Sequence, residues 1–412
     1  MARSAPALST FTAGEISPRL EGRVTIAKYR EGLADLTNMI VQPHGGVTRR
    51  PGTEFLGEVK NSANVTRLIP FEFKTSDTYA LEFGDQYMRV FRNGLQVLTG
   101  SAASVTAISK ASPGVLTANS HGLSNGDEVF LSNSGGNMTE LTSRNYLVAN
   151  KTTNTFTLTD LFGVAINTTN FTTYTGSGVT VDKIYEKATP YTSAQINDVR
   201  FAQSADVMYL VHPSHAVRTL TRSDHNNWTF ATPTITENTT PSLVGTDNHP
   251  SVVTFFEQRL VFAATNNNPQ TLFFSKNADY LNFTTGTADN DALIYTIASN
   301  KVNAIRYLSA TRILNIGTSG GEYVLTTTNG SPVTPTSTVI RKYSNYGCVD
   351  AEVVQVADVT LFAQRGARKV REFRYVGEVD VGGYTAPDIT VLAEHLTEGG
   401  IKEFAFQQEP ES

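Results

Sequence analysis

The stretch Gln258-Arg-Leu-Val-Phe-Ala-Ala264, a polar turn and Thr271-Leu-Phe-Phe-Ser275 together have the pattern of a β-hairpin. Apolar residues fill both short runs, and the Asn and Pro residues between them favour a reversal of the chain. Four further pairs of runs repeat this arrangement of strand, polar turn and strand. They are 77–83 with 87–91, 206–211 with 216–220, 311–316 with 322–326, and 358–363 with 369–373. The chain therefore contains a repeated hairpin.

The five hairpins are evenly spaced once one long insertion is set aside. They begin at residues 77, 206, 258, 311 and 358, which gives steps of 129, 52, 53 and 47 residues. The first step falls to 48 if the 81 residues of 103–183 form a separate unit. Another strand usually precedes the hairpin, and four-stranded repeats of about 50 residues are typical of β-propeller blades. An irregular β-sandwich is the alternative, and we favour the propeller because the steps agree within a few residues.

This spacing divides the chain into three parts. Residues 1–102 hold an N-terminal segment and the first blade, 103–183 an inserted small β-domain, and 184–412 the remaining blades. The insertion has short Thr-rich runs with Asn-Gly and Gly-Gly turns, which predicts a small barrel or sandwich serving as a spacer or contact module. Helices are scarce. Residues 27–39 are the best candidate, although they contain Gly32.

The amino-acid composition and net charge exclude several classes of function. The 412 residues are 40% hydrophobic and only 17% charged, with a net charge of -5, which argues against a general nucleic-acid binder. Cys348 is the only cysteine, so internal disulfides and cysteine metal clusters are excluded. No apolar run approaches 18 residues, and the first residues lack the apolar core of a signal peptide. We expect a mainly β chain made in a reducing compartment, without a membrane span.

One motif suggests catalysis, but its context favours a turn. Gly317-Thr-Ser319-Gly-Gly321 matches G-x-S-x-G, the nucleophile elbow of α/β-hydrolases, which requires a strand-to-helix turn. Here it lies between two predicted strands, where glycines permit a hairpin. We therefore predict no catalytic residue.

Two other groups of residues suggest metals only weakly. His212 and His215, with His225 nearby, bracket a proline turn without an obvious third ligand, so we interpret them as solvated turn histidines. Asp289-Asn-Asp291 lacks the spaced oxygen ligands of a calcium loop and is interpreted as a polar loop cap. No metal or cofactor is predicted.

Five basic residues fall within ten positions of the last hairpin: Arg365, Arg368, Lys369, Arg371 and Arg374. On a strand, Lys369 and Arg371 share one face, while Arg368 and Arg374 point the other way. One interpretation is a docking or phosphate-facing patch. The interpretation we favour is a solvated edge that discourages sheet-to-sheet aggregation.

The N-terminal segment is more specific than any of these features. Phe11-Thr-Ala-Gly-Glu-Ile-Ser-Pro18 is followed by Asn38-Met-Ile-Val-Gln-Pro-His-Gly45-Gly46-Val-Thr-Arg49-Arg50-Pro51-Gly52-Thr53 and by Arg67-Leu-Ile-Pro-Phe71. Gly45-Gly46 and Pro51-Gly52 predict two tight turns that flank a short basic segment. Together with the stretches 197–212, 250–262, 274–283 and 297–305, the arrangement resembles the tail tubular protein B, or tail nozzle, family of short-tailed bacteriophages. The resemblance covers most of the chain outside 103–183.

The resemblance implies a structural virion protein without catalysis or cofactor, made in the host cytoplasm and located in the tail. Six such chains form a propeller-containing ring below the head-to-tail adaptor ring. The ring continues the DNA channel, retains packaged DNA and allows its ejection, and its flank meets tail fibres or spikes. A chain of low net charge suits a lumen through which genomic DNA passes without specific binding. Arg49 and Arg50 are candidates for contact with a neighbouring subunit or the DNA path.

Two competing functions stay open. The first is a receptor- or glycan-binding β-propeller of a tail appendage, with Trp228, Tyr174 and Tyr191 as stacking residues. The second is a cell-wall hydrolase, which needs paired acids or a zinc site, and the sequence offers no strong candidate. Members of the resembled family usually run past the point where this chain stops. Either the chain is truncated relative to that family, or the propeller closes with fewer blades or an unusual terminal strand.

Overall fold

The computed structural model describes residues 8–135, 137–238, 240–298, 302–327, 330–377 and 383–407. Within these ranges the chain forms β-strands, turns and short 3-10 helices, and no α-helix occurs. Residues 299–301, inside one stretch of the family resemblance, and the C-terminal residues 408–412 lie outside the described residues.

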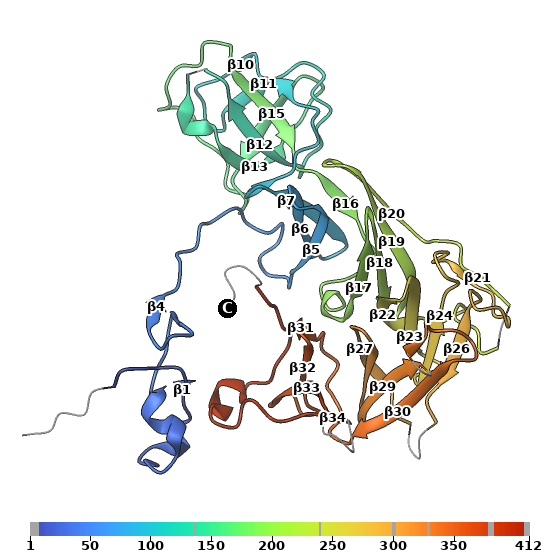
Figure 1. Cartoon of the computed structure of the whole chain (residues 1–412). Coiled ribbons are helices and arrows are strands. Elements are labelled where there is room, and N and C mark those ends of the chain that lie inside the picture. Colours follow the sequence, from blue (N-terminus) through green and yellow to red (C-terminus); the bar gives the residue numbers. More distant parts are fainter. Residues whose placement is uncertain are drawn as a thin grey trace, which may run out of the picture.

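Five antiparallel sheets, here called blades 1 to 5, follow one another around an arc (Figure 1). In each blade the four strands pair in the order in which they occur in the chain. Blade 1 contains β5 (Arg67–Lys74), β6 (Asp77–Gly84), β7 (Tyr87–Arg92) and β16 (Glu186–Ala188), with β8 (Leu95–Gln96) also paired to β7. Blade 2 contains β17 (Arg200–Ser204), β18 (Val207–His212), β19 (His215–Asp224) and β20 (Asn227–Ala231). Blade 3 contains β22 (Pro250–Phe256), β23 (Arg259–Thr265), β24 (Thr271–Phe274) and β26 (Leu293–Thr296).

The last two blades have the same order. Blade 4 contains β27 (Ile305–Ala310), β28 (Leu314–Thr318), β29 (Gly321–Thr327) and β30 (Thr338–Ser344). Blade 5 contains β31 (Val354–Val356), β32 (Val359–Ala363), β33 (Val370–Val376) and β34 (Gly383–Thr385). Each hairpin predicted from the sequence supplies the second and third strands of one blade, so the propeller-like fold is confirmed. Outside the blades, β21 (Thr236–Glu237) pairs in parallel with β25 (Asn282–Phe283).

Neighbouring blades are held together by apolar side chains that alternate between two faces. All seven residues of β23 are buried. Leu260 and Phe262 pack toward blade 2, whereas Val261 and Ala263 pack toward blade 4. A strand covered on both faces needs a continuous apolar run, which is what this segment of sequence contains. Full burial of each large apolar side chain contributes about 1.5–3 kcal/mol.

The inserted residues form a sheet of their own, drawn at the top of Figure 1. Its strands pair in the order β10-β11-β14-β13-β12-β15-β9 around a separate apolar cluster that includes Leu131 and Phe156. The strands are β9 (Ala103–Ser104), β10 (Ala107–Ile108), β11 (Val115–Thr117), β12 (Glu128–Asn133), β13 (Arg144–Ala149), β14 (Thr155–Thr159) and β15 (Val179–Lys183), with the 3-10 helix η3 (Thr139–Leu141). Because β16 follows the insertion and pairs with β7, blade 1 is completed by residues beyond the inserted sheet.

Residues 8–50, here called the N-terminal unit, lie outside the arc of blades (Figure 1). The unit contains β1 (Gly14–Glu15), η1 (Pro18–Leu20), η2 (Ala27–Glu31), β2 (Gly32–Leu33), β3 (Met39–Val41) and β4 (Val47–Arg49). The helix expected over 27–39 is wrong, because only the five residues of η2 are helical. Gly32 instead pairs with Gly14, and a Cβ at Gly32 would lie 2.8 Å from the Ile16 side chain. Tertiary packing therefore overrides the local helix propensity.

Candidate functional site

The Gly45–Gly46 turn predicted from the sequence is confirmed. It joins β3 to β4, Gly45 has φ of +101°, and a Cβ there would lie 2.5 Å from Thr10 Oγ1. The Gly45 carbonyl accepts a hydrogen bond of 2.8 Å from the Phe11 amide, which ties the hairpin to the start of the motif. The second predicted turn, at Pro51–Gly52, is wrong, because residues 50–59 run without a turn. Arg49 and Arg50 are exposed beside this segment.

The N-terminal unit contacts the chain after blade 5. The Ser17 amide donates a 2.7 Å hydrogen bond to the Leu392 carbonyl, and His395 Nε2 lies 2.8 Å from Glu15 Oε1. Hydrogen bonds, first from His395 and then from the Leu36 amide, lower the pKa of Glu15. Arg19 pairs with Glu394, which begins the 3-10 helix η6 (Glu394–Thr397). Residues more than 370 positions apart in sequence thus meet at one junction.

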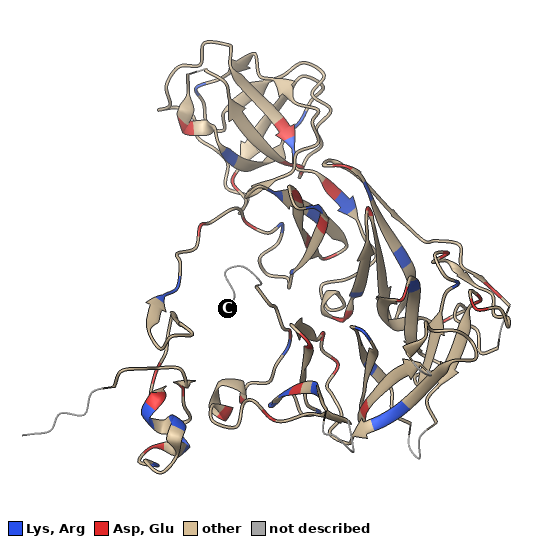
Figure 2. Ribbon diagram, viewed as in Figure 1, with Lys and Arg blue, Asp and Glu red and all other residues tan. Residues whose placement is uncertain are grey.

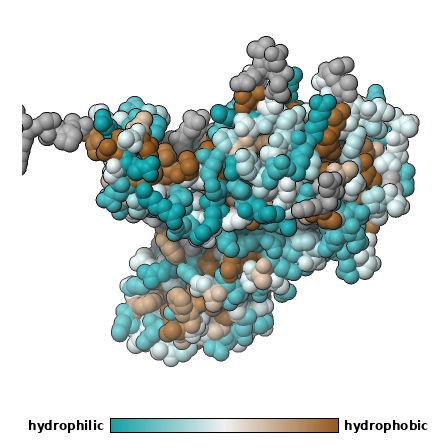
Figure 3. Space-filling model, turned by 90° about the horizontal axis from the view of Figure 1, so that it is seen from below, coloured by the Kyte–Doolittle hydropathy of each residue, from teal (hydrophilic) through white to brown (hydrophobic). Residues whose placement is uncertain are grey.

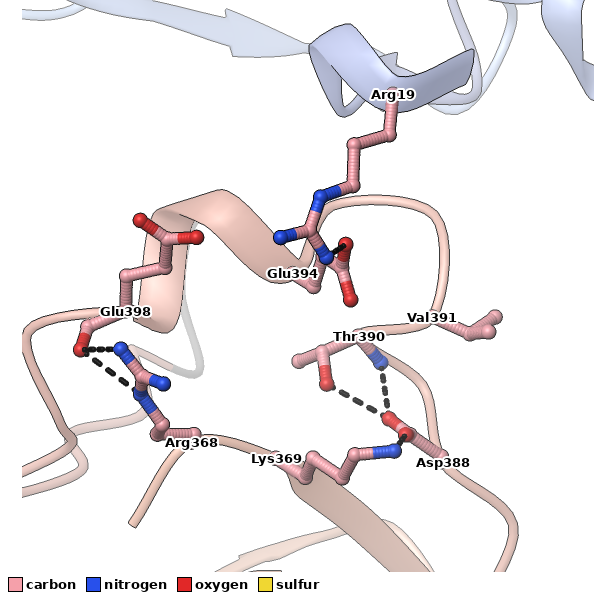
Figure 4. A pocket seen from close by; sticks show the side chains of 8 residues that line it. All are labelled: Arg19, Arg368, Lys369, Asp388, Thr390, Val391, Glu394 and Glu398. Atoms are coloured by element: carbon pink, nitrogen blue, oxygen red, sulfur yellow. Dashed lines mark hydrogen bonds and ion pairs between the residues drawn. The ribbon is translucent and has the colours of Figure 1, made fainter.

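An open pocket of about 210 Å³ lies at this junction (Figure 4). Arg19 reaches into it from η1, and Arg368 and Lys369 reach into it from blade 5. Arg368 donates two hydrogen bonds, of 3.0 and 2.9 Å, to the Glu398 carbonyl. Lys369 Nζ lies 2.9 Å from Asp388 Oδ2.

Asp388 is the best-satisfied acid of the pocket. The Thr390 amide and hydroxyl donate to Asp388 Oδ1 at 2.9 and 2.7 Å. Burial raises the pKa of Asp388, but hydrogen bonds from Thr390 and Lys369 outweigh it, so that the pKa is lowered. Three basic and three acidic residues line the pocket, so it offers no excess positive charge to a phosphate. We therefore interpret the pocket as part of the contact between the N-terminal unit and blade 5 with the residues that follow it.

The five basic residues interpreted as a solvated edge, with a docking patch as the alternative, do not share one surface. Arg371 is buried: its Nε donates to Gln364 Oε1 at 2.9 Å, and its guanidinium lies 3.4 Å from the centre of the Tyr346 ring. Arg374 is exposed and pairs with Glu372 at 3.4 Å, and Arg365 is exposed in the β32–β33 turn. Docking by the exposed members stays a prediction.

The G-x-S-x-G motif lies in the hairpin between β28 and β29, as predicted, and not in a strand-to-helix turn. Its first glycine is required by packing, because a Cβ on Gly317 would lie 1.9 Å from Tyr307 Cε1, a buried ring. We expect Gly317→Ala to lower the free energy of unfolding by about 1–3 kcal/mol. Ser319→Ala should change it by less than about 0.5 kcal/mol. If the chain is a virion protein, as the family resemblance implies, this variant should also leave particle infectivity intact.

Urea denaturation of both variants and plaque counts on particles carrying them check this expectation. A large loss of infectivity for Ser319→Ala in normally assembled particles would restore the catalytic interpretation. Equal stability of Gly317→Ala and the parent would mean that the Tyr307 ring can move away.

The interpretation of the histidines as solvated is wrong for His212. It is buried in β18, its Nδ1 accepts a 2.9 Å hydrogen bond from the Ser214 amide, and its ring centre lies 5.1 Å from that of His215. Burial, followed by the nearby His215, lowers the pKa of His212 to about 4. Within the described ranges, no three His, Cys, Asp or Glu side chains come together as metal ligands would.

The Asp289–Asp291 loop caps a buried cation. Arg259 is almost completely buried, and its guanidinium donates to the carbonyls of Ser275, Asp289 and Asp291 at 2.6–2.7 Å. The Asp291 carboxylate lies 2.9 Å from Lys276. The loop therefore supplies backbone oxygens to an arginine, which fits the prediction of a polar cap.

The candidate sugar-stacking residues are unavailable to a ligand. Trp228 and Tyr191 are buried in the apolar cluster between blades 1 and 2. Tyr174 is half-buried in the insertion, and its hydroxyl donates to the Val105 carbonyl at 2.7 Å. These three rings fill cores instead of presenting their faces.

Sequence reasoning missed an ion-pair cluster at the centre of the arc, where blades 1 and 5 approach each other. Arg67, the first residue of β5, pairs with Glu352 at 2.6 Å and with Glu403 at 2.8 Å. Asp350 lies 2.6 Å from Arg306 and 3.4 Å from Arg200. Arg67, Arg200 and Arg306 all occur near the start of the first strand of their blade. The recurrence of arginine at this position of the blade was the sequence signal that could have revealed the cluster.

No protein-family model matches the chain, and no curated protein matches it in sequence. Among solved structures it is similar to the phage phi92 endosialidase at 14% identity and a TM-score of 0.28, over 73% of this chain and 53% of that chain. It is also similar to the β-propeller domain of Myceliophteria thermophila Cps50 (Swd1), at 10% identity and a TM-score of 0.33, over 78% and 88% of the two chains. The NanB sialidase of Streptococcus pneumoniae has 10% identity and a TM-score of 0.30, over 83% of this chain and 64% of that chain. Because these scores are low, the fold assignment rests on the strand order given above.

Charge and hydropathy are mixed over the surface. Basic and acidic residues are interspersed along the ribbon (Figure 2), and hydrophilic colours dominate the face seen from below, where apolar groups form separate patches (Figure 3). The helices of the described ranges are short 3-10 turns, and none could serve as a membrane span.

Proposed function

We propose that this chain is a structural subunit of a bacteriophage tail nozzle ring, without catalytic activity or cofactor. In this role six copies extend the DNA channel below the adaptor ring, retain packaged DNA and allow its ejection into the host. The proposal starts from the sequence resemblance, which covers most of the chain outside the insertion. It places the protein in the virion tail, in contact with the adaptor ring and with fibres or spikes.

The structural observation that carries the proposal is the N-terminal unit with its exposed linker. Phe55 is 79% exposed and Leu56 51% exposed on the segment between β4 and β5. Val24 and Met39, on the unit itself, are at least half exposed. Neighbouring apolar side chains with such exposure mark surfaces that are covered in an assembly. A segment of this kind suits contact with the adjacent subunit of a ring.

The interspersed charges support passage of DNA. A lumen lined by many unpaired basic groups would hold the phosphate backbone, with an affinity that increases for each contact. The arginines at the centre of the arc are instead paired with Asp350, Glu352 and Glu403. The centre of the arc therefore offers no unpaired arginine from this cluster to a phosphate, which agrees with a chain that does not bind DNA specifically.

We expect the purified chain to assemble into six-subunit rings, and Phe55→Ser with Leu56→Ser to shift it to monomers with an unchanged unfolding temperature. The polar side chains would remove the apolar contact with the neighbouring subunit. Native mass spectrometry measures the copy number, and cryo-electron microscopy of particles that contain the chain locates the ring. Phe162→Ser, at a side chain 80% exposed in the insertion, is the matched control and should assemble normally.

Two results would contradict the nozzle assignment. One is a parent chain that stays monomeric at the concentrations at which particles assemble. The other is a set of three copies on peripheral appendages, which would favour a receptor-binding role.

A further inference from the structure

A second, larger pocket opens at one end of blades 3, 4 and 5. Its walls come from the turns between the first and second strands of these blades, and from the ends of β29 and β33. In an antiparallel meander these positions all lie at the same end of the sheets. The pocket has a volume of about 920 Å³, within the range of about 300–1,000 Å³ that is usual for small-molecule sites.

One wall of this pocket is aromatic. The ring of Tyr384 stacks on the buried ring of Phe373 with a centroid distance of 5.2 Å, and Tyr375 lies 5.3 Å from Tyr384. Tyr375 is 60% exposed. The buried Phe373 ring therefore fixes the Tyr384 ring by stacking, and much of the Tyr375 ring is accessible to a ligand.

The pocket also contains a buried polar group that lacks a partner. Asn315 is only 4% exposed and lines the pocket; its Nδ2 donates to Thr360 Oγ1 at 3.2 Å, and its Oδ1 has no hydrogen-bond partner among the described residues. If the amide were turned over, its nitrogen would be the unpaired atom. A buried polar atom without a partner costs about 1–3 kcal/mol, which a hydroxyl group of a ligand would relieve.

Charged side chains stand at the rim of the pocket. Arg312 and Asp358 are exposed there and form no ion pair or side-chain hydrogen bond with the described residues. Glu257, also at the rim, accepts a 2.6 Å hydrogen bond from the Val333 amide. The rim thus presents one cation and two carboxylates, which disfavours a phosphate or another strongly anionic ligand.

We propose that this pocket binds a neutral saccharide. A pyranose ring has an apolar face that packs on an aromatic ring, and hydroxyl groups at its edge that both donate and accept hydrogen bonds. Tyr375 and Tyr384 supply the aromatic faces, Asn315 the buried polar partner, and Arg312 and Asp358 the charge-assisted hydrogen bonds. A peptide from a second copy fits less well, because most of the described wall consists of turns and side chains. This inference does not depend on ring assembly.

The test uses the purified full chain on an array of neutral hexose and N-acetylhexosamine oligosaccharides, followed by calorimetric titration with the oligosaccharide that binds most strongly. We expect reproducible binding, and a Kd weakened by about tenfold in Tyr375→Ala and in Asp358→Ala. Both side chains are exposed, so both variants should fold, and their unfolding temperatures are measured to verify it. Phe162→Ala, on the inserted domain, is the control that should bind like the parent.

Three results would overturn the proposal: no neutral oligosaccharide binds, the two pocket variants bind like the parent, or Phe162→Ala abolishes binding. If Tyr375→Ala instead prevents self-association while no oligosaccharide binds, the pocket is a contact between copies. In that case the saccharide site is rejected and the ring assignment is unaffected.

Discussion

Replacing Arg67 with methionine is expected to lower the free energy of unfolding by about 2–4 kcal/mol, because the substitution removes a buried cation from two partly exposed carboxylates and a buried carbonyl. Arg67 Nη2 lies 2.6 Å from Glu352 and 2.8 Å from Glu403, and its Nη1 donates to the Val199 carbonyl at 2.6 Å. Burial raises the pKa of Glu352, and Arg67 opposes that shift. Without Arg67, two carboxylates and one buried carbonyl lose this partner together.

The measurement is urea denaturation followed by the fluorescence of Trp228, the only tryptophan. Trp228 lies in the same apolar cluster as Val199, so its emission reports on the region that Arg67 holds. Arg19→Met is the matched control, because the Arg19–Glu394 pair is exposed and such pairs contribute only about 0–1 kcal/mol. If Arg67→Met were as stable as the parent, apolar packing alone would join the two ends of the arc.

The blades were predictable because each central hairpin is a short apolar run with turn residues at its ends. The fourth strands of blades 1 and 5 were not predictable. β16 and β34 have three residues each, none of them buried, so their sequences have no alternation of apolar and polar positions to detect. The same limit explains why the fourth strand of blade 1 was not recognised beyond the insertion.

The sites were less predictable than the fold, because they join distant parts of the chain. Arg19 meets Glu394 across 375 positions, and no local pattern relates the two residues. The saccharide pocket likewise depends on Asn315 and Tyr375, which belong to different blades. Local patterns instead suggested His212 as a solvated residue, since a proline turn follows it, whereas packing between blades buries its ring. Sequence patterns identify strands, and the contacts between blades decide which polar residues are buried.

Glu322 provides the second large prediction, which concerns pH. Its side chain, in β29, is completely buried; it accepts a hydrogen bond from the Ser344 hydroxyl, and its Oε1 has no partner among the described residues. Burial raises the pKa of Glu322 to about 7, against the opposing backbone hydrogen bonds of Tyr346 and Gly347. An acid with a higher pKa in the folded chain holds its proton more tightly when folded. Its contribution to stability is therefore complete below pH 4.5 and is lost as the pH rises through about 7.

We expect Glu322→Gln, which resembles the protonated acid, to exceed the free energy of unfolding of the parent by less than about 1 kcal/mol at pH 5 and by a larger amount at pH 8. The excess at pH 8 should be on the order of 3 kcal/mol, since each pKa unit corresponds to about 1.4 kcal/mol. Urea denaturation of both proteins at the two pH values gives the difference. Both proteins contain the same other titratable groups, so the comparison removes their effect on the free energy of unfolding. One of them is His212, whose lowered pKa makes the folded chain less stable as the pH falls from 6.5 to about 4.

Glu394→Gln, at an exposed ion pair, is the control, and its difference from the parent should stay below about 1 kcal/mol at both pH values. A Glu322→Gln difference that is the same at pH 5 and pH 8 would mean that Glu322 keeps one charge state across this range. A difference that is large only at pH 8 is the expected result, and it would mean that the ionised Glu322 destabilises the core between blades 4 and 5, where it lies beside Tyr307 and Cys348.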